Sequence, residues 1–161
     1  NDIVKNNLKK ILVSKGIDQD RLLFTNRMMH SEHLARLKLA DLFLDTYPCN
    51  AHTTASDSLR SCLPIITLRG NSFASRVTSS LLSSVGLAKL ITDTKQEYEE
   101  LAVKIATEND YFAKIKNELK NNIKTKPLLN TRMFTKNLEK AYFNVYENYI
   151  NNKIPETIEI N

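Results

Sequence analysis

The stretch LADLFLDTYPCNAHTTASDSL, residues Leu39 to Leu59, decides the fold that we expect. Its short apolar run Leu42-Phe43-Leu44 is typical of a buried strand in a parallel sheet. A loop follows from Asp45 to Ala51, and it contains the turn-forming residues proline and asparagine. From His52 onward, small and apolar residues recur at helical spacing. The stretch therefore predicts a strand, a loop and the N-terminus of a helix.

This strand-to-helix junction favours an anion site. Ligands bind at such junctions in open α/β sheets, because the free N–H groups and the dipole of the helix start attract phosphate. His52, Thr53 and Thr54 stand at the expected start, and Asp57 lies one turn further on, where a carboxylate can accept hydrogen bonds from sugar hydroxyls. A helix that is merely capped fits the same spacing, because a threonine followed by Asp57 resembles a capping box.

A second junction is expected upstream of the first. Arg21 to Thr25 reads as a short strand, residues 26–31 as a loop, and the following residues as a helix that carries His33 and Arg36. These two side chains share a helix face, where an imidazole and a guanidinium can hold a planar base by stacking and hydrogen bonding. From the spacing alone, a surface histidine and a surface arginine are the simpler interpretation.

The remaining pattern indicates an α/β fold: a partial Rossmann-like parallel sheet flanked by helices, followed by C-terminal helices. Leu63 to Leu68 and Leu87 to Ile91 read as strands, the second at the sheet edge. Helices are expected over Asp2–Lys15, Ser72–Ser84, Thr94–Thr107, Tyr111–Ile123 and Thr131–Ile150. The aromatic stripe of the last helix favours core packing over a ligand site.

Composition narrows the function classes. The 161 residues, 42% of them hydrophobic, suit one globular domain or a piece of one, and no apolar run of membrane-spanning length occurs. Two cysteines without metal-ligand spacing, and no signal peptide, favour a reducing, cytoplasmic location. The net charge of +5 weakly favours an anionic partner. The lysines are dispersed and no basic stripe is interleaved with aromatics, which argues against nucleic-acid binding.

Five segments carry a resemblance to a known family: HLARLKLADLFLDT, NAHTTASDSL, SFASRV, QEYEELAVKIATE and FTKNLEKAYFNVYENY. Together they resemble the C-terminal catalytic lobe of bacterial O-linked N-acetylglucosamine (O-GlcNAc) transferases, which are inverting glycosyltransferases with two Rossmann-like lobes, the GT-B arrangement. The resemblance covers nearly the whole chain. It implies transfer of N-acetylglucosamine from UDP-GlcNAc to Ser or Thr of acceptor proteins, with no metal or other cofactor.

The resemblance also implies roles for individual residues. The positions that match His33 and Arg36 contact the uracil, and the backbone at the position of Met28 reads the base edge. The position of His30 is a ribose or phosphate contact that is often lysine in the family, so histidine is a departure here.

On the phosphate side, the resemblance implies that the backbone N–H groups of His52, Thr53 and Thr54 stabilise the diphosphate and that Asp57 holds the ribose. No catalytic residue is expected within this chain. The resemblance puts the catalytic histidines, a phosphate-binding lysine and the TPR-type helical repeats that recruit acceptor proteins upstream.

We accordingly expect residues 1–126 to form a UDP-sugar-binding Rossmann-like lobe that lacks its N-terminal strands. Residues 127–150 are expected to form a C-terminal helix that packs back on the catalytic lobes, and residues 151–161 a loose tail. Such a piece should be inactive alone, and its exposed sheet edge makes an oligomer conceivable.

Two departures from the family pattern keep another function class open. Arg60 stands where tryptophan is frequent, and Arg69-Gly70-Asn71 replaces a frequent proline-glycine-glutamate turn. The alternative is a non-catalytic nucleotide-binding or protein-interaction module. A further alternative is a transferase that uses another sugar nucleotide such as GDP-fucose. The plant-type enzymes that use that donor lack the His-Thr-Thr and following Asp, which favours UDP.

Overall fold

The computed structural model describes residues 1–160 and divides the chain into two compact units, Asn1–His33 and Leu34 onward. The first unit contains helix α1 (Asp2–Ser14) and the short 3-10 helix η1 (Gln19–Arg21). The Asn1 side chain caps α1 by accepting from the Ile3 N–H at 3.0 Å. Gly16, at φ +73°, follows the end of the helix. Helix α2 (His30–Leu37) begins in this unit and continues into the second.

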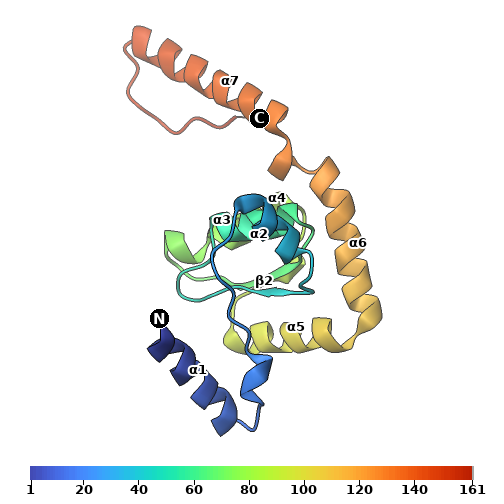
Figure 1. The fold of residues 1–161 in the computed structure, drawn as a ribbon. Helices are drawn as coiled ribbons and strands as arrows, with labels where there is room; N and C mark the ends of the chain where they lie inside the picture. The colour runs from blue at the N-terminus through green and yellow to red at the C-terminus, as the bar shows by residue number, and fades with distance from the viewer. Residues whose placement is uncertain (161) are drawn as a thin grey trace. The chain divides into compact units, whose positions relative to one another are not determined.

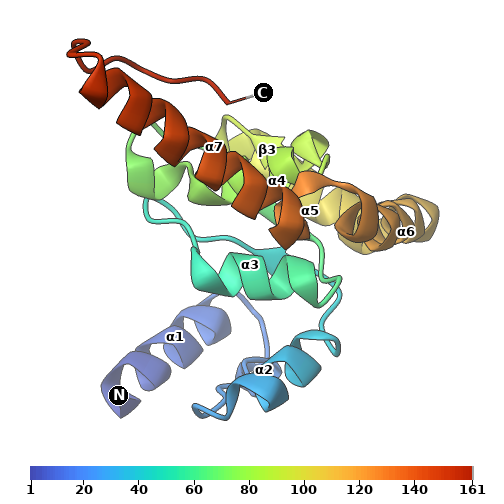
Figure 2. The same cartoon turned by 90° about the horizontal axis from the view of Figure 1, so that it is seen from above.

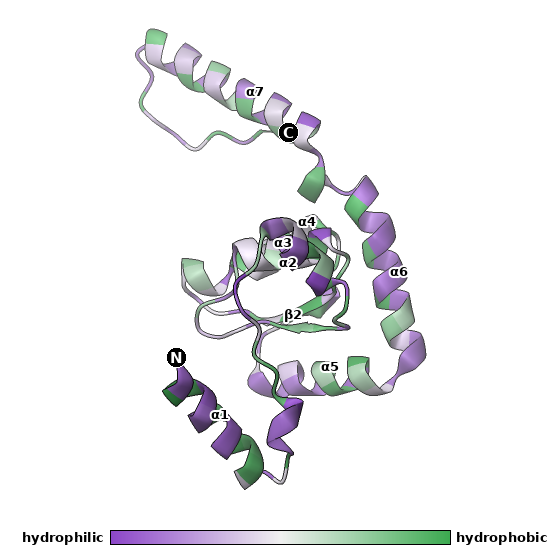
Figure 3. Cartoon of the chain, viewed as in Figure 1, coloured by the Kyte–Doolittle hydropathy of each residue, from purple (hydrophilic) through white to green (hydrophobic). Residues whose placement is uncertain are grey.

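The second unit is built on a parallel sheet in the order β1-β2-β3, formed by Phe43–Leu44, Ile65–Leu68 and Ile91–Thr92. Phe43 pairs with Ile65, and Thr67 pairs with Ile91. Every residue of β2 is buried, and Figure 3 shows this strand as predominantly apolar. A fully buried and mostly apolar central strand is typical of a parallel sheet with helices on both faces.

Helices cover both faces of this sheet. Figure 1 shows α3 (Thr53–Arg60) and α4 (Val77–Ser84) on one face and α5 (Lys95–Thr107) on the other. The chain continues through α6 (Asn109–Thr125) into α7 (Thr131–Ile150), and short 3-10 segments occur at Phe73–Ser75 (η2), Ala88–Leu90 (η3) and Pro127–Leu129 (η4). The buried core consists mainly of Ala55, Leu59, Ile65, Ile66, Leu82, Val85, Leu87, Leu90, Ile105, Ile115 and Leu119.

Three strand predictions need correction. The run Leu42-Phe43-Leu44 supplies strand β1, but the strand is not buried as predicted, because Phe43 is half-buried and Leu44 is 52% exposed. The strand expected over Arg21 to Thr25 is wrong, because Arg21 ends a 3-10 helix and residues 22–29 have no regular structure. Leu23 there is 82% exposed, so its apolar character does not reflect burial in the sheet. The strand expected from Leu87 begins only at Ile91. Leu87 and Leu90 are buried, but residues 88–90 form the 3-10 helix η3 and not a strand.

Helix α7 has the predicted bounds, but its aromatic stripe is not buried against the other described residues. No α7 residue is buried, and Phe134, Tyr142 and Tyr149 are 63%, 67% and 78% exposed. Figure 2 shows α7 from a second direction. The helical spacing was informative about the element, but nothing in residues 1–160 covers this face. Within the same range, no helix is both long enough and apolar enough to cross a bilayer.

Candidate functional site at the start of α3

Helix α3 begins at Thr53 directly after the loop that leaves β1. Its N-cap is His52, which makes no side-chain capping hydrogen bond, so the capping role predicted for Thr53 or Thr54 with Asp57 is wrong. The first turn closes with a 3.1 Å bond from Ser56 N to His52 O. The N–H groups of Thr53 and Thr54 therefore have no acceptor within the helix.

Packing of the opposite helix face holds this start in place. Ala55, Ser58 and Leu59 are fully buried, and Ser58 Oγ donates to Thr54 O at 2.8 Å. His52, Thr53 and Thr54 remain exposed, while Asp57 is half-buried. The arrangement presents backbone donors without an intrahelical acceptor and two threonine hydroxyls at the positive end of a helix dipole, which is a favourable environment for an anion.

The loop before α3 is fixed by its own hydrogen bonds. Thr46 Oγ1 donates to Cys49 O at 2.6 Å, and Asn50 Nδ2 donates to Thr46 O at 2.9 Å. The peptide bond between Tyr47 and Pro48 is cis. Two further bonds tie the loop to η2 and to α4: Asn50 N donates to Ala74 O at 2.8 Å, and Thr78 Oγ1 donates to Ala51 O at 2.8 Å. The loop is therefore a constrained connection between β1 and α3.

Asp45, at the start of this loop, is a buried carboxylate that sequence reasoning missed as a site residue. Its Oδ1 accepts from the backbone N–H groups of Thr46 (2.9 Å) and Ala51 (2.7 Å), and its Oδ2 accepts from Thr67 Oγ1 (2.6 Å). The one feature of the sequence that could have indicated this role is the position of the aspartate directly after an apolar strand. Such an aspartate is also common as an ordinary loop residue, so the pattern alone did not reveal the network.

The backbone carbonyl of Asp45 accepts a further hydrogen bond, from the Tyr98 hydroxyl on α5 at 2.9 Å. Burial, and to a lesser extent the negative charge of Asp45, raises the pKa of Tyr98 from 10.0 to about 12. Both influences favour the neutral phenol, so the hydroxyl remains a donor.

The residues predicted to hold the base lie around α2. His30 is the first residue of that helix, and His33 and Arg36 lie one turn apart on it, both half-buried. Met28 precedes the helix and is 37% exposed. In the first unit, the Glu32 carboxylate accepts from the Met29 N–H at 3.0 Å, which fixes the entry to α2. Within the second unit, Ser61 Oγ donates to Leu34 O at 3.3 Å and links the later part of α2 to the end of α3.

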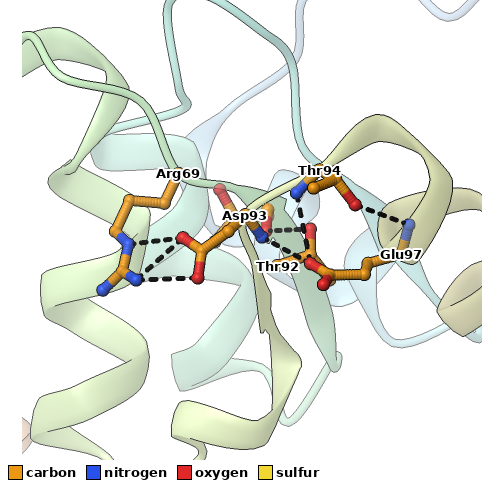
Figure 4. A network of polar contacts seen from close by, with 6 residues as sticks. Arg69, Thr92, Asp93, Thr94 and Glu97 are labelled. Carbon is orange, nitrogen blue, oxygen red and sulfur yellow. Dashed lines mark hydrogen bonds and ion pairs between the residues drawn. The ribbon is translucent and has the colours of Figure 1, made fainter.

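Arg69, one of the departures noted in the sequence, has a structural partner. Its guanidinium donates to both carboxylate oxygens of Asp93, with Nε–Oδ1 at 2.8 Å and Nη2–Oδ2 at 2.9 Å (Figure 4). Beside it, Thr94 and Glu97 form the capping box of α5: Glu97 N donates to Thr94 Oγ1 at 3.1 Å, and Glu97 Oε2 accepts from Thr94 N at 3.2 Å. Arg69 follows β2 and Asp93 follows β3, so the ion pair between them links the ends of the two strands.

Arg60, the other departure, is the last residue of α3. It lies seven positions after Thr53 on this helix, a rise of roughly 10 Å. It lines a surface hollow of about 460 Å³ together with residues 127–131 and Phe134. Arg60 and Arg69, the two residues that depart from the family pattern, therefore both lie outside the first turn of α3. Residues 1–160 contain no cluster of three or more His, Cys, Asp or Glu side chains arranged to hold a metal ion.

Comparison with known proteins agrees with this architecture. Residues 3–138 match glycosyl transferase family 41. The chain is 36% identical over 148 residues to the probable UDP-N-acetylglucosamine–peptide N-acetylglucosaminyltransferase SEC of Arabidopsis thaliana, covering 91% of this chain and 15% of that protein. It is 39% identical over 109 residues to the UDP-N-acetylglucosamine–peptide N-acetylglucosaminyltransferase of Caenorhabditis elegans, covering 68% and 10%.

A solved structure shows the same fold. The K341M mutant of the Thermobaculum terrenum O-GlcNAc transferase superposes with a TM-score of 0.80 at 30% identity, over 88% of this chain and 27% of that one. The chain therefore spans a small part of the proteins that it matches.

Proposed function

Because the chain belongs to glycosyl transferase family 41, we propose that it is the donor-nucleotide-binding part of an inverting glycosyltransferase. The proposed donor is UDP-GlcNAc and the proposed acceptors are Ser and Thr hydroxyls of proteins. The observation that carries the proposal is the start of α3, where exposed threonines and backbone donors without intrahelical acceptors follow a parallel strand. The names of the relatives support this choice of donor.

In the proposed reaction, the acceptor hydroxyl displaces UDP from the anomeric carbon of the sugar. Negative charge develops on the diphosphate as the glycosidic bond breaks. N–H groups at His52, Thr53 and Thr54 stabilise that charge without needing to reorganise, and the loss of one such donor typically costs about 3 kcal/mol of transition-state stabilisation. The proposal assigns this role to the helix start and uses no metal ion.

The remaining site residues orient the nucleotide. Asp57 accepts hydrogen bonds from the ribose, and His33 and Arg36 hold the uracil between a ring and a guanidinium. The backbone at Met28 reads the base edge, and His30 lies near the ribose or phosphate. The general base and the remaining phosphate contacts come from the part of the enzyme that precedes this chain.

A transfer assay tests the proposal. A protein that carries this chain behind its upstream lobe is incubated with UDP-GlcNAc and a serine-containing acceptor peptide, with and without a chelator. We expect sugar transfer that the chelator leaves unchanged, and none from residues 1–161 alone. Nucleotide binding without transfer by the longer protein would favour the non-catalytic module, and transfer from GDP-fucose instead of UDP-GlcNAc would overturn the donor assignment.

A further inference from the structure

Asp45 joins three parts of the second unit through one carboxylate. Its Oδ1 accepts the N–H groups at both ends of the connecting loop, Thr46 at 2.9 Å and Ala51 at 2.7 Å. Its Oδ2 accepts the hydroxyl proton of Thr67 in the central strand at 2.6 Å. Asp45 is 6% exposed and Thr67 is fully buried, so these bonds are shielded from competing water.

The bond to Ala51 reaches the residue immediately before the N-cap of α3. The neighbouring carbonyl, Ala51 O, is held separately by Thr78 Oγ1 at 2.8 Å. Both sides of this residue are therefore anchored to buried groups. These two hydrogen bonds set the direction in which the chain enters the first turn of α3. That direction in turn sets where the N–H groups of Thr53 and Thr54 point.

The chemistry of the acceptor also matters. An ionised carboxylate only accepts hydrogen bonds, so one side chain can bind two amides and a hydroxyl simultaneously. Bonds of this charge-assisted kind are roughly twice as strong as neutral ones. The carboxylate also occupies the N–H of Ala51, which leaves the amides of the helix start as the donors available to a ligand.

We propose that Asp45 is a positioning residue, whose carboxylate holds the loop of residues 46–51 so that the first-turn amides of α3 are aimed at the diphosphate. This inference rests on the proposed function, because it takes a nucleoside diphosphate as the ligand. Asp45 itself does not touch the ligand in this account. It acts through Ala51 and the orientation of Thr53 and Thr54.

The test compares UDP with uridine, which has the base and ribose but no phosphate. Dissociation constants for both are measured by calorimetry or ligand-detected NMR on a protein that carries this chain behind its upstream lobe. Asp45→Ala is expected to weaken UDP binding by about tenfold or more, because small misplacements of binding groups are costly. Uridine binding is expected to change by less than about twofold, because the base contacts are elsewhere.

Milder variants keep the test usable if Asp45→Ala fails to fold. Asp45→Asn retains an oxygen that can accept both amide protons, so UDP binding should be recovered at least in part. Thr67→Val removes only the hydroxyl contact and should reduce UDP affinity selectively by a smaller factor. Thr92→Val is the matched control: it removes a buried threonine hydroxyl that donates to Thr67 O at 3.0 Å without touching the loop.

Two results overturn the inference in distinguishable ways. Equal weakening of UDP and uridine, or no selective loss of UDP affinity in Asp45→Ala and Thr67→Val, would show that Asp45 supports only the fold. Absence of UDP binding by the unmodified protein would overturn the proposed function and this inference together.

Discussion

The hydroxyl of Tyr98 donates a 2.9 Å hydrogen bond to the backbone carbonyl of Asp45, which joins two residues 53 positions apart in the sequence. Tyr98 lies on α5, and Asp45 follows β1. The bond therefore attaches the helix on one face of the sheet to the loop that leads into α3 on the other face. Burial of the phenol makes this connection sensitive to strongly alkaline pH.

The titration of Tyr98 provides a first prediction. Its folded-state pKa of about 12 exceeds the ordinary 10.0, so folding favours the protonated form. This contribution to the free energy of unfolding is fully present below pH 10 and is lost as the pH rises through 12. Tyr98→Phe should remove that pH dependence and, by deleting one hydrogen bond, lower stability near neutral pH by about 1 kcal/mol.

Tyrosinate absorbance across an alkaline titration, together with denaturant unfolding at each pH, measures both effects. The contribution of the lysines is common to the two proteins and cancels in the comparison. We expect the wild-type protein to show a late tyrosine titration step that the Tyr98→Phe variant lacks. If the two proteins titrate alike, the buried environment assigned to Tyr98 is contradicted.

Gly70 provides a second prediction, because its backbone passes too close to Ser75 for a side chain. A Cβ at Gly70 would lie 2.7 Å from Ser75 Cβ and 3.2 Å from the Tyr47 ring. Ser75 is buried and held by bonds to Ser72, including Ser75 N to Ser72 Oγ at 3.3 Å. Gly70→Ala should therefore lower the free energy of unfolding by about 2–3 kcal/mol, as overpacking does.

Gly86→Ala is the control for that measurement. Gly86 has a positive φ of +74°, but its nearest neighbours are the ends of the flexible Asn122 and Lys126 side chains. Its substitution should cost about 1 kcal/mol from backbone strain. Equal unfolding midpoints for the two variants in a denaturant titration would contradict the close approach at Gly70.

Thr94 and Thr53, which both stand at helix starts, give a third prediction, because only Thr94 is a cap. Thr94 caps α5 through its hydroxyl, whereas Thr53 is inside α3 and makes no capping bond. Thr94→Ala should cost about 1 kcal/mol of stability and leave UDP affinity within about twofold. Thr53→Ala should cost less stability but weaken UDP binding, because it removes a proposed phosphate donor.

Thermal unfolding and UDP titration of both variants decide this prediction. We expect the larger loss of stability in Thr94→Ala and the larger loss of UDP affinity in Thr53→Ala. If Thr94→Ala proves worse in both measurements, Thr53 has no role in phosphate binding.

Sequence patterns predicted the parts of this fold that depend on local or continuous signals. The bounds of α7 followed from its 3.6-residue periodicity, and β2 followed from a short, mostly apolar run between turn residues. The strand expected over Arg21 to Thr25 failed because a strand is defined by its hydrogen-bonded neighbour, which local propensity does not supply. The N-cap of α3 is His52, one or two residues before the predicted Thr53 or Thr54, because the threonines that look like caps lie inside the helix.

Contacts between residues far apart in the chain could not be predicted from the sequence. The hydrogen bond between Asp45 and Thr67 joins residues 22 positions apart, and both residue types are common in loops and strands. The exposed side of α7 was also unpredictable, because periodicity shows that a helix has an apolar face but does not show what covers it. The residues proposed for uracil binding came from family resemblance rather than from spacing.

The most direct test of the central claim is a calorimetric titration with UDP and with GDP. It uses the protein that carries this chain behind its upstream lobe, together with its Arg36→Ala and Asp57→Ala variants. The account predicts binding of UDP that is at least about tenfold tighter than that of GDP, and loss of this binding in both variants. Equal affinity for the two nucleotides, or no UDP binding by the folded protein, would contradict the assignment of this chain as the UDP-sugar-binding part of the enzyme.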